Sequence, residues 1–93
     1  MENIKIFSLR DCYPYLISED YQNRFIGEYL ELGLRIHRLE KMIVMYRSGS
    51  LDFTPNCSLG ILELQLTQMR GYKTILEKRA IVENIELPEV KYE

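Results

Sequence analysis

The sequence predicts an all-α fold: an antiparallel hairpin of two long helices with an N-terminal arm, assembled into a homo-oligomeric helical bundle. Two observations predict the hairpin. The 93 residues include only 5 Gly and 3 Pro and are 46% hydrophobic, which is typical of a single helix-rich domain over residues 1–93. Within residues 21–47, apolar side chains recur in alternating steps of four and three, which is the period of one helix face and not of a strand.

Residues 1–18 are expected to form the N-terminal arm and not the start of a long helix. Pro14 restricts the residue before it, and the apolar residues come in two short bursts. A short helix or strand around Ile4 to Leu9 fits this pattern. Two roles are open for the arm: a cover over the end of the hairpin, or a lid over a ligand.

The first long helix is expected over residues 19–47. Ser18 is a suitable N-cap, and Glu19 and Asp20 place negative charge at the positive end of the helix dipole. Gly33 inside this helix costs about 1 kcal/mol relative to Ala. We therefore expect a neighbouring group to approach the helix backbone closely at Gly33.

The second long helix is expected over residues 55–85, after a Ser-Gly-Ser break. Thr54 as N-cap followed by proline marks its start, and Ser58 is an alternative start. Pro88 prevents continuation, so residues 86–93 are expected to form a loose polar tail. The short connection makes the two helices antiparallel.

Each long helix carries more apolar surface than a two-helix hairpin can bury. A hairpin covers one face of each helix, so a second apolar stripe requires another chain or stays exposed. The sequence therefore predicts an obligate oligomer. The second stripes comprise Ile26, Leu30, Leu34 and Val44 on the first helix, and Leu64, Gly71, Ile75 and Val82 on the second.

Composition argues against several classes of function. The net charge of −2 does not fit a binder of polymeric nucleic acid, which usually carries a basic excess. One His and two widely spaced cysteines, Cys12 and Cys57, match no metal-ligand pattern. The first residues have neither a basic n-region nor a long apolar run, so we expect no signal peptide, and the pattern predicts neither a membrane-spanning segment nor a nucleophile constellation. We expect a cytosolic protein with free thiols, no metal or cofactor, no membrane partner and no enzymatic activity.

A basic and aromatic face lies beside the seam of the first helix, by which we mean the apolar face whose residues recur in steps of four and three. Arg24, Arg35 and Arg38 fall within roughly a quarter turn of Tyr21. An aromatic ring suits a base and a guanidinium suits a phosphate, so these residues are candidate nucleotide ligands. Tyr21 and Arg35 lie about 21 Å apart along the helix, so only two antiparallel protomers can bring them together. The alternative is a solvated face with weak ion pairs.

The second helix offers two further candidate ligand residues, Arg70 and Tyr72. In the alternative interpretation Tyr72 packs within the hairpin and Arg70 lies in solvent. His37 belongs to the second apolar stripe, where a packed interface histidine is expected in preference to a catalyst.

Two segments, YQNRFIGEYLELGLRIHRLEKMI and LELQLTQMRGYKTILEKRA, resemble the helical hairpin shared by phage sponges of cyclic-nucleotide immune signals. That family has a Tyr and an Arg at the start of the first helix, a basic-Ile-x-basic-Leu element, then Leu-x-x-Gln-Leu-x-x-Met-x-x-Tyr and a late Arg. Because little follows residue 87, the chain is similar to the anti-CBASS branch and not to the larger anti-Thoeris branch. The matching positions here are Tyr21, Arg24, Arg35, Ile36, Arg38, Leu39, Leu62, Gln65, Leu66, Met69, Tyr72 and Arg79.

The resemblance implies a homo-hexamer of antiparallel dimers in the cytoplasm of the infected bacterial host. It implies that the hexamer binds cyclic dinucleotides, and in some members cyclic trinucleotides at separate pockets, without cleaving them. Tyr21 takes the aromatic position and Arg35 the central basic position, where family members often have Lys. The alternative is a non-enzymatic structural or protein-binding helical oligomer with no small-molecule ligand.

Overall fold

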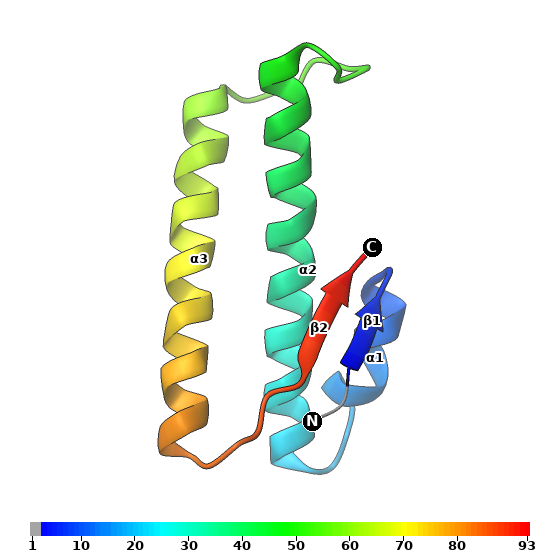
Figure 1. The fold of residues 1–93 in the computed structure, drawn as a ribbon, viewed down its shortest axis with the longest axis vertical. Coiled ribbons are helices and arrows are strands. Elements are labelled where there is room, and N and C mark those ends of the chain that lie inside the picture. The colour runs from blue at the N-terminus through cyan, green and yellow to red at the C-terminus, as the bar shows by residue number, and fades with distance from the viewer. Residues whose placement is uncertain (1–2) are drawn as a thin grey trace.

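A computed structural model describes residues 3–93 of the chain, so residues 1–2 of the expected arm lie outside the described residues. Two long antiparallel helices form a hairpin, and a small layer made of a short helix and a two-stranded parallel sheet packs on the outer side of the first long helix (Figure 1). The fold is therefore mostly helical, and the expected all-α class is corrected by the sheet. In chain order the elements are β1 (Asn3–Ile6), α1 (Leu9–Leu16), α2 (Tyr21–Ser48), α3 (Leu59–Val82) and β2 (Glu89–Tyr92).

The long helices begin where side chains cap them. Asp20, and not Ser18, accepts a hydrogen bond from the backbone N–H of Gln22 at 3.0 Å, so α2 begins at Tyr21. It ends where Gly49 takes the left-handed conformation, with φ 75°. The alternative start of the second helix is the one observed, because Ser58 accepts from the N–H of Ile61 and α3 begins one residue later.

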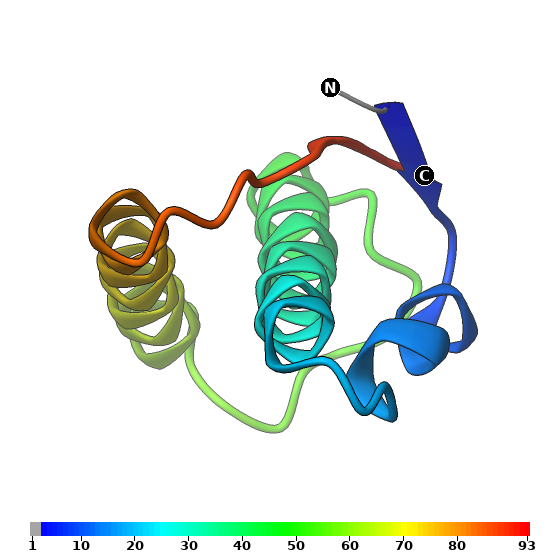
Figure 2. The ribbon, with the colours of Figure 1, turned by 90° about the horizontal axis from the view of Figure 1, so that it is seen from below.

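The hairpin core lies between α2 and α3, as the seam predicts. Side chains at alternating steps of four and three on α2 meet a stripe on α3, and both are buried. Burial of this seam holds the helices side by side along their length (Figures 1 and 2). The buried set is Phe25, Tyr29, Leu32, Ile36, Leu39, Ile43, Leu62, Leu66, Leu76, Ala80 and Ile85.

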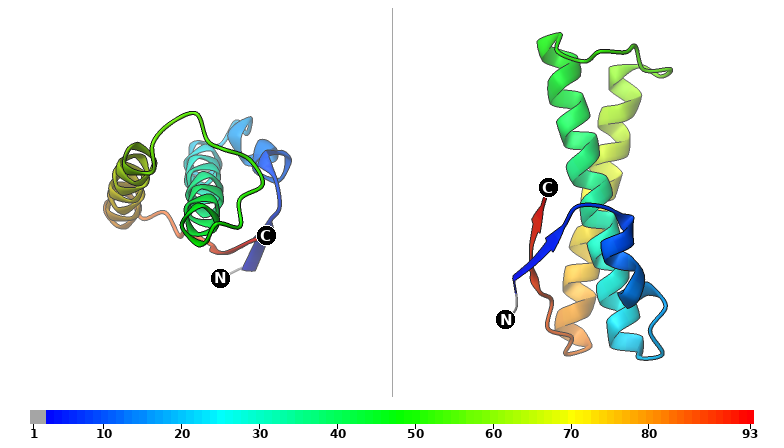
Figure 3. Two further views of the ribbon diagram at one scale, coloured as in Figure 1. Left: turned by 90° about the horizontal axis from the view of Figure 1, so that it is seen from above. Right: turned by 90° about the vertical axis from the view of Figure 1, so that its right-hand side faces the viewer.

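A second core covers the opposite side of α2. Leu30 and Leu34 are fully buried against Ile6 and Cys12 of the N-terminal arm. The expectation that these two leucines need another chain is therefore wrong, because the termini of the same chain cover them. Val44, further along the same stripe, remains 64% exposed. Figure 3 agrees: the arm and the tail flank only the part of α2 farthest from the α2–α3 loop.

The C-terminal tail is ordered where the sequence predicts a loose segment. β2 pairs in parallel with β1, with Ile4 opposite Val90 and Ile6 opposite Tyr92. Alternate residues of both strands turn toward α2, which is the period of two expected of a half-buried strand. Strands from opposite ends of the chain thus close over one helix.

Two glycines of α2 allow this layer to approach. A Cβ at Gly27 would lie 2.9 Å from Leu16 Cδ2 and from the Leu16 backbone nitrogen. A Cβ at Gly33 would overlap the hydroxyl group of Tyr92. The predicted close approach at Gly33 is confirmed, and the approaching group belongs to the same chain.

Candidate functional site

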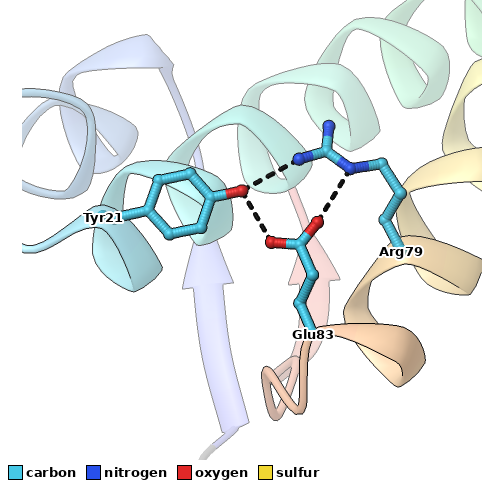
Figure 4. Close-up of polar contacts among 3 residues, drawn as sticks. All are labelled: Tyr21, Arg79 and Glu83. Atoms are coloured by element: carbon cyan, nitrogen blue, oxygen red, sulfur yellow. Dashed lines mark hydrogen bonds and ion pairs between the residues drawn. The ribbon is translucent and has the colours of Figure 1, made fainter.

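Tyr21 lies at the start of α2, where the end of α3 comes beside it. Its hydroxyl donates a hydrogen bond to Glu83 Oε1 at 2.7 Å and accepts one from Arg79 Nη2 at 2.9 Å. Arg79 Nε donates to Glu83 Oε2 at 3.0 Å, which closes a ring of three interactions (Figure 4). The three side chains therefore form one hydrogen-bonded cluster that joins the two helices at the open end of the hairpin.

The interactions within this cluster shift the pKa values of all three of its groups. The hydrogen bond to Glu83 raises the pKa of the Tyr21 hydroxyl, and the same bond lowers the pKa of the Glu83 carboxyl. The interaction with Glu83 also raises the pKa of the Arg79 guanidinium. At neutral pH the cluster is a phenol with a carboxylate and a guanidinium that offset each other in charge.

The ring of Phe25 packs beside this cluster. The centroids of the Tyr21 and Phe25 rings are 6.4 Å apart with planes inclined by 58°, and the Arg79 guanidinium carbon lies 5.0 Å from the centre of the Phe25 ring. Phe25 is buried, whereas Tyr21 is 47% exposed. The ring of Tyr21 thus packs against Phe25 and still exposes part of its surface to solvent.

The three candidate arginines of α2 lie in different environments. Arg24 Nη1 donates to the backbone oxygens of Ser18 and Glu19, both at 2.8 Å, so it supports the turn before α2. Arg35 is exposed and lies 3.9 Å from Glu31, a weak ion pair. Arg38 Nη2 contacts the backbone oxygen of Phe7 at 3.5 Å. Of these residues, Arg35 has the side chain that is freest to meet a ligand.

The two candidates on α3 do not share a face. Arg70 and Tyr72 are two residues apart and project about 160° apart around the helix. Arg70 forms an ion pair with Glu40 across the hairpin, and the ion pair of Arg47 with Glu63 joins the same two helices. Tyr72 is 43% exposed. One protomer therefore does not bring Arg70 together with the other candidates.

Sequence reasoning missed Arg79 and Glu83 as partners of Tyr21. Their spacing of four residues near the end of a helix is visible in the sequence, and Arg79 occupies the late Arg position of the resembled pattern. Neither signal points to Tyr21, because that pairing depends on the register in which α3 returns along α2. The register follows from the buried seam and not from any local motif.

The described residues give no sign of a metal centre or a membrane segment. Over residues 3–93, no group of three or more His, Cys, Asp or Glu side chains lies close enough together to hold a metal ion. Within the same residues, none of the helices combines the length and the apolar character that crossing a membrane requires.

A family model described as Sequestin matches residues 19–81, well over half of the chain. The protein therefore belongs to the Sequestin family. Membership indicates a sequestering role toward a small signalling molecule, and it agrees with the resemblance to phage anti-CBASS sponges. No curated protein and no solved structure matches the chain. The matched segment contains all six candidate ligand residues and Arg79.

Proposed function

We propose that this protein is a phage anti-defence sponge that captures cyclic oligonucleotide second messengers in the cytoplasm of the infected bacterium. It binds cyclic dinucleotides, with cyclic trinucleotides as a second class of ligand, and does not cleave them. Removal of the free messenger prevents activation of the CBASS effector. The observation that carries the proposal is the Sequestin match over residues 19–81, which spans nearly all of the hairpin and includes Tyr21 and Arg79 of the cluster, but not Glu83.

The chemistry of two exposed side chains supports this ligand class. The Tyr21 ring offers a surface for stacking on a nucleobase. The Arg35 guanidinium, held only by a weak ion pair to Glu31, offers two parallel hydrogen bonds to a phosphate. Cyclic oligonucleotides combine bases and phosphates in one compact ring, so a stacking group and a guanidinium together match their chemistry.

The site requires a second protomer. Tyr21 and Arg35 lie about four turns apart on one straight helix, so we place Tyr21 of one protomer beside Arg35 of an antiparallel partner. Apolar residues on the back of α3 support such assembly. Ile61, Leu64, Ile75 and Val82 are between 56% and 80% exposed and recur along one side of the helix. A homo-hexamer of antiparallel dimers would cover this surface.

Gly71 lies in the middle of the same exposed surface of α3. Among residues 3–93, apart from its own neighbours in the helix, no atom lies within 4 Å of the position that a Cβ would take there. A glycine inside a helix costs about 1 kcal/mol relative to Ala, and the fold of one protomer does not use the space. Close approach of another chain at Gly71 would account for it.

Titration calorimetry tests the proposal. Cyclic di-AMP, cyclic di-GMP, cyclic GMP–AMP and a cyclic tri-adenylate are titrated into the protein, its Arg35→Ala variant and its Arg10→Ala variant. Arg10 is an exposed arginine on α1, so its loss controls for net charge. We expect at least one ligand to bind the unaltered protein and Arg10→Ala, while Arg35→Ala keeps its native mass and loses binding. Absence of heat with every ligand would refute the proposal.

Two further measurements separate the sponge from its alternatives. Heat denaturation of the loaded protein should release chemically intact nucleotide, whereas an enzyme would release cleaved product. The exposed stripe on α3 also suits a structural or protein-binding oligomer without a small ligand. A protein that stays monomeric by native mass spectrometry and binds only another protein would favour that alternative.

A further inference from the structure

The hydroxyl of Tyr21 makes two side-chain hydrogen bonds although the residue is exposed. An exposed tyrosine usually leaves its hydroxyl to water, but this one donates to Glu83 and accepts from Arg79. Both partners lie at the C-terminal end of α3, Arg79 in its last turn and Glu83 at its C-cap, while Tyr21 belongs to α2. The contact of its ring with Phe25 adds a further restraint. The direction of the ring is therefore set relative to both helices before any ligand arrives.

The charge of Glu83 is unfavourable at an anion site. A carboxylate close to a phosphate repels it, and here Glu83 also engages the guanidinium of Arg79. On simple electrostatics, removing this carboxylate should strengthen the binding of an anionic ligand. If loss of Glu83 weakens the complex, its carboxylate must therefore favour binding by a means other than its charge.

We propose that Glu83, together with Arg79, is a positioning residue that holds the ring of Tyr21 in the orientation in which it stacks on a nucleobase. The inference rests on the proposed function and adds to it a group that does not touch the ligand. A ring fixed in advance loses less conformational freedom on binding, so affinity rises without a new ligand contact. Because the anchor lies at the C-cap of α3, the geometry of the hairpin end becomes part of ligand recognition.

The test compares four single variants, and the double variant that combines Tyr21→Phe with Glu83→Ala, by calorimetry with cyclic GMP–AMP, cyclic di-AMP and cyclic di-GMP as probes. Tyr21→Phe keeps the stacking ring and removes the hydroxyl, and Glu83→Ala removes the anchor. Glu83→Gln keeps an oxygen that can accept the Tyr21 hydrogen bond. Glu86→Ala, at an exposed glutamate near the same end of α3, removes an equal charge and is the control.

We expect Tyr21→Phe and Glu83→Ala each to weaken binding by roughly fivefold, the effect of one lost directed hydrogen bond. The double variant should bind no more weakly than Tyr21→Phe alone, because loss of the hydroxyl already removes its hydrogen bond to Glu83. Glu83→Gln should recover most of the affinity, and Glu86→Ala should bind as well as the unaltered protein or better. Native mass and unfolding temperature are recorded for every variant.

Several outcomes would overturn the positioning role. Unchanged or tighter binding by Glu83→Ala, normal binding by Tyr21→Phe, or independent losses in the double variant would each do so while leaving the sponge intact. If the unaltered protein binds none of the probes, the proposed function fails and this inference fails with it. The two failures are therefore distinguishable in one set of titrations.

Discussion

The ring of Tyr92 occupies the space beside α2 that a side chain at Gly33 would need. The Tyr92 hydroxyl donates to the backbone oxygen of Leu30 at 3.3 Å, and its ring stacks on His37 with centroids 5.9 Å apart. Tyr92 of β2 thus holds the terminal layer, formed by β1, α1 and β2, against α2. His37, expected to pack at an interface between chains, packs within one chain against Tyr92 of the C-terminal strand.

Gly33→Ala should destabilise the protein, although Ala is the better helix former. The added methyl group collides with the Tyr92 hydroxyl, and overpacking of this kind costs about 1–3 kcal/mol, more than the gain in helix propensity of about 1 kcal/mol. We expect a lower midpoint in urea unfolding. Hydrogen exchange should also become faster in β1 and β2. A more stable Gly33→Ala variant would show that Tyr92 does not fill this space.

Gly71→Ala should have the opposite effect on a single protomer. The site is open within the described residues, so the substitution should stabilise the dissociated chain by about 0.5–1 kcal/mol. If another copy packs at Gly71, the methyl group holds the two helices apart. The assembly should then dissociate at a higher protein concentration. Native mass spectrometry over a dilution series measures this, and an unchanged dissociation profile would argue against an interface at Gly71.

Arg24→Ala and Arg35→Ala should differ in stability. Arg24 holds two backbone oxygens of the turn before α2, so its loss should cost about 1 kcal/mol of unfolding free energy. Arg35 forms only a weak exposed ion pair, so its loss should change the unfolding free energy by less than about 0.5 kcal/mol. Chemical denaturation of both variants compares them directly. Equal losses would mean that Arg35 has a structural partner in the assembled protein.

Stability should fall at alkaline pH. Burial raises the pKa of Tyr29 from 10.0 to about 12, helped by the hydrogen bond to Glu77, and burial raises the pKa of Tyr92 as well. Above pH 10 the unfolded chain loses these protons while the folded chain keeps them. The stability from Tyr29 is therefore complete below pH 10 and is lost as the pH rises toward about 12.

Each such group contributes a slope of at most about 1.4 kcal/mol per pH unit. Unfolding temperatures measured from pH 8 to 11.5 should show this decline. Tyr29→Phe should reduce the slope, and Tyr13→Phe, at an exposed tyrosine, serves as the control. A slope that Tyr29→Phe leaves unchanged would contradict the assignment.

Much of the hairpin could be predicted because its signals are local. The alternating steps of four and three from Phe25 to Ile43 determined a helix and the face that it buries. Ser58 and Gly49 marked helix boundaries through side-chain capping and left-handed geometry, both of which depend on a few adjacent residues. The Sequestin match over residues 19–81 covers this same predictable part.

The terminal layer could not be predicted in the same way. β1 and β2 are only four residues long each, too short for a clear period, and each is stabilised mainly by the other and by α2. The second stripe of α2 showed that Leu30 and Leu34 need a cover, but not which segment supplies it. Parallel pairing of Ile4 with Val90 supplied that cover from within the chain.

The sequence by itself determined two amphipathic helices, their antiparallel pairing and a surplus of apolar surface. These features could be predicted because residues three and four apart in the sequence share one face of a helix. Only the tertiary structure decided how that surplus is divided. The termini cover Leu30 and Leu34, while the back of α3 stays exposed. It also decided that Tyr21 meets Glu83, since contacts between residues far apart in the chain depend on how the helices pack and in which register.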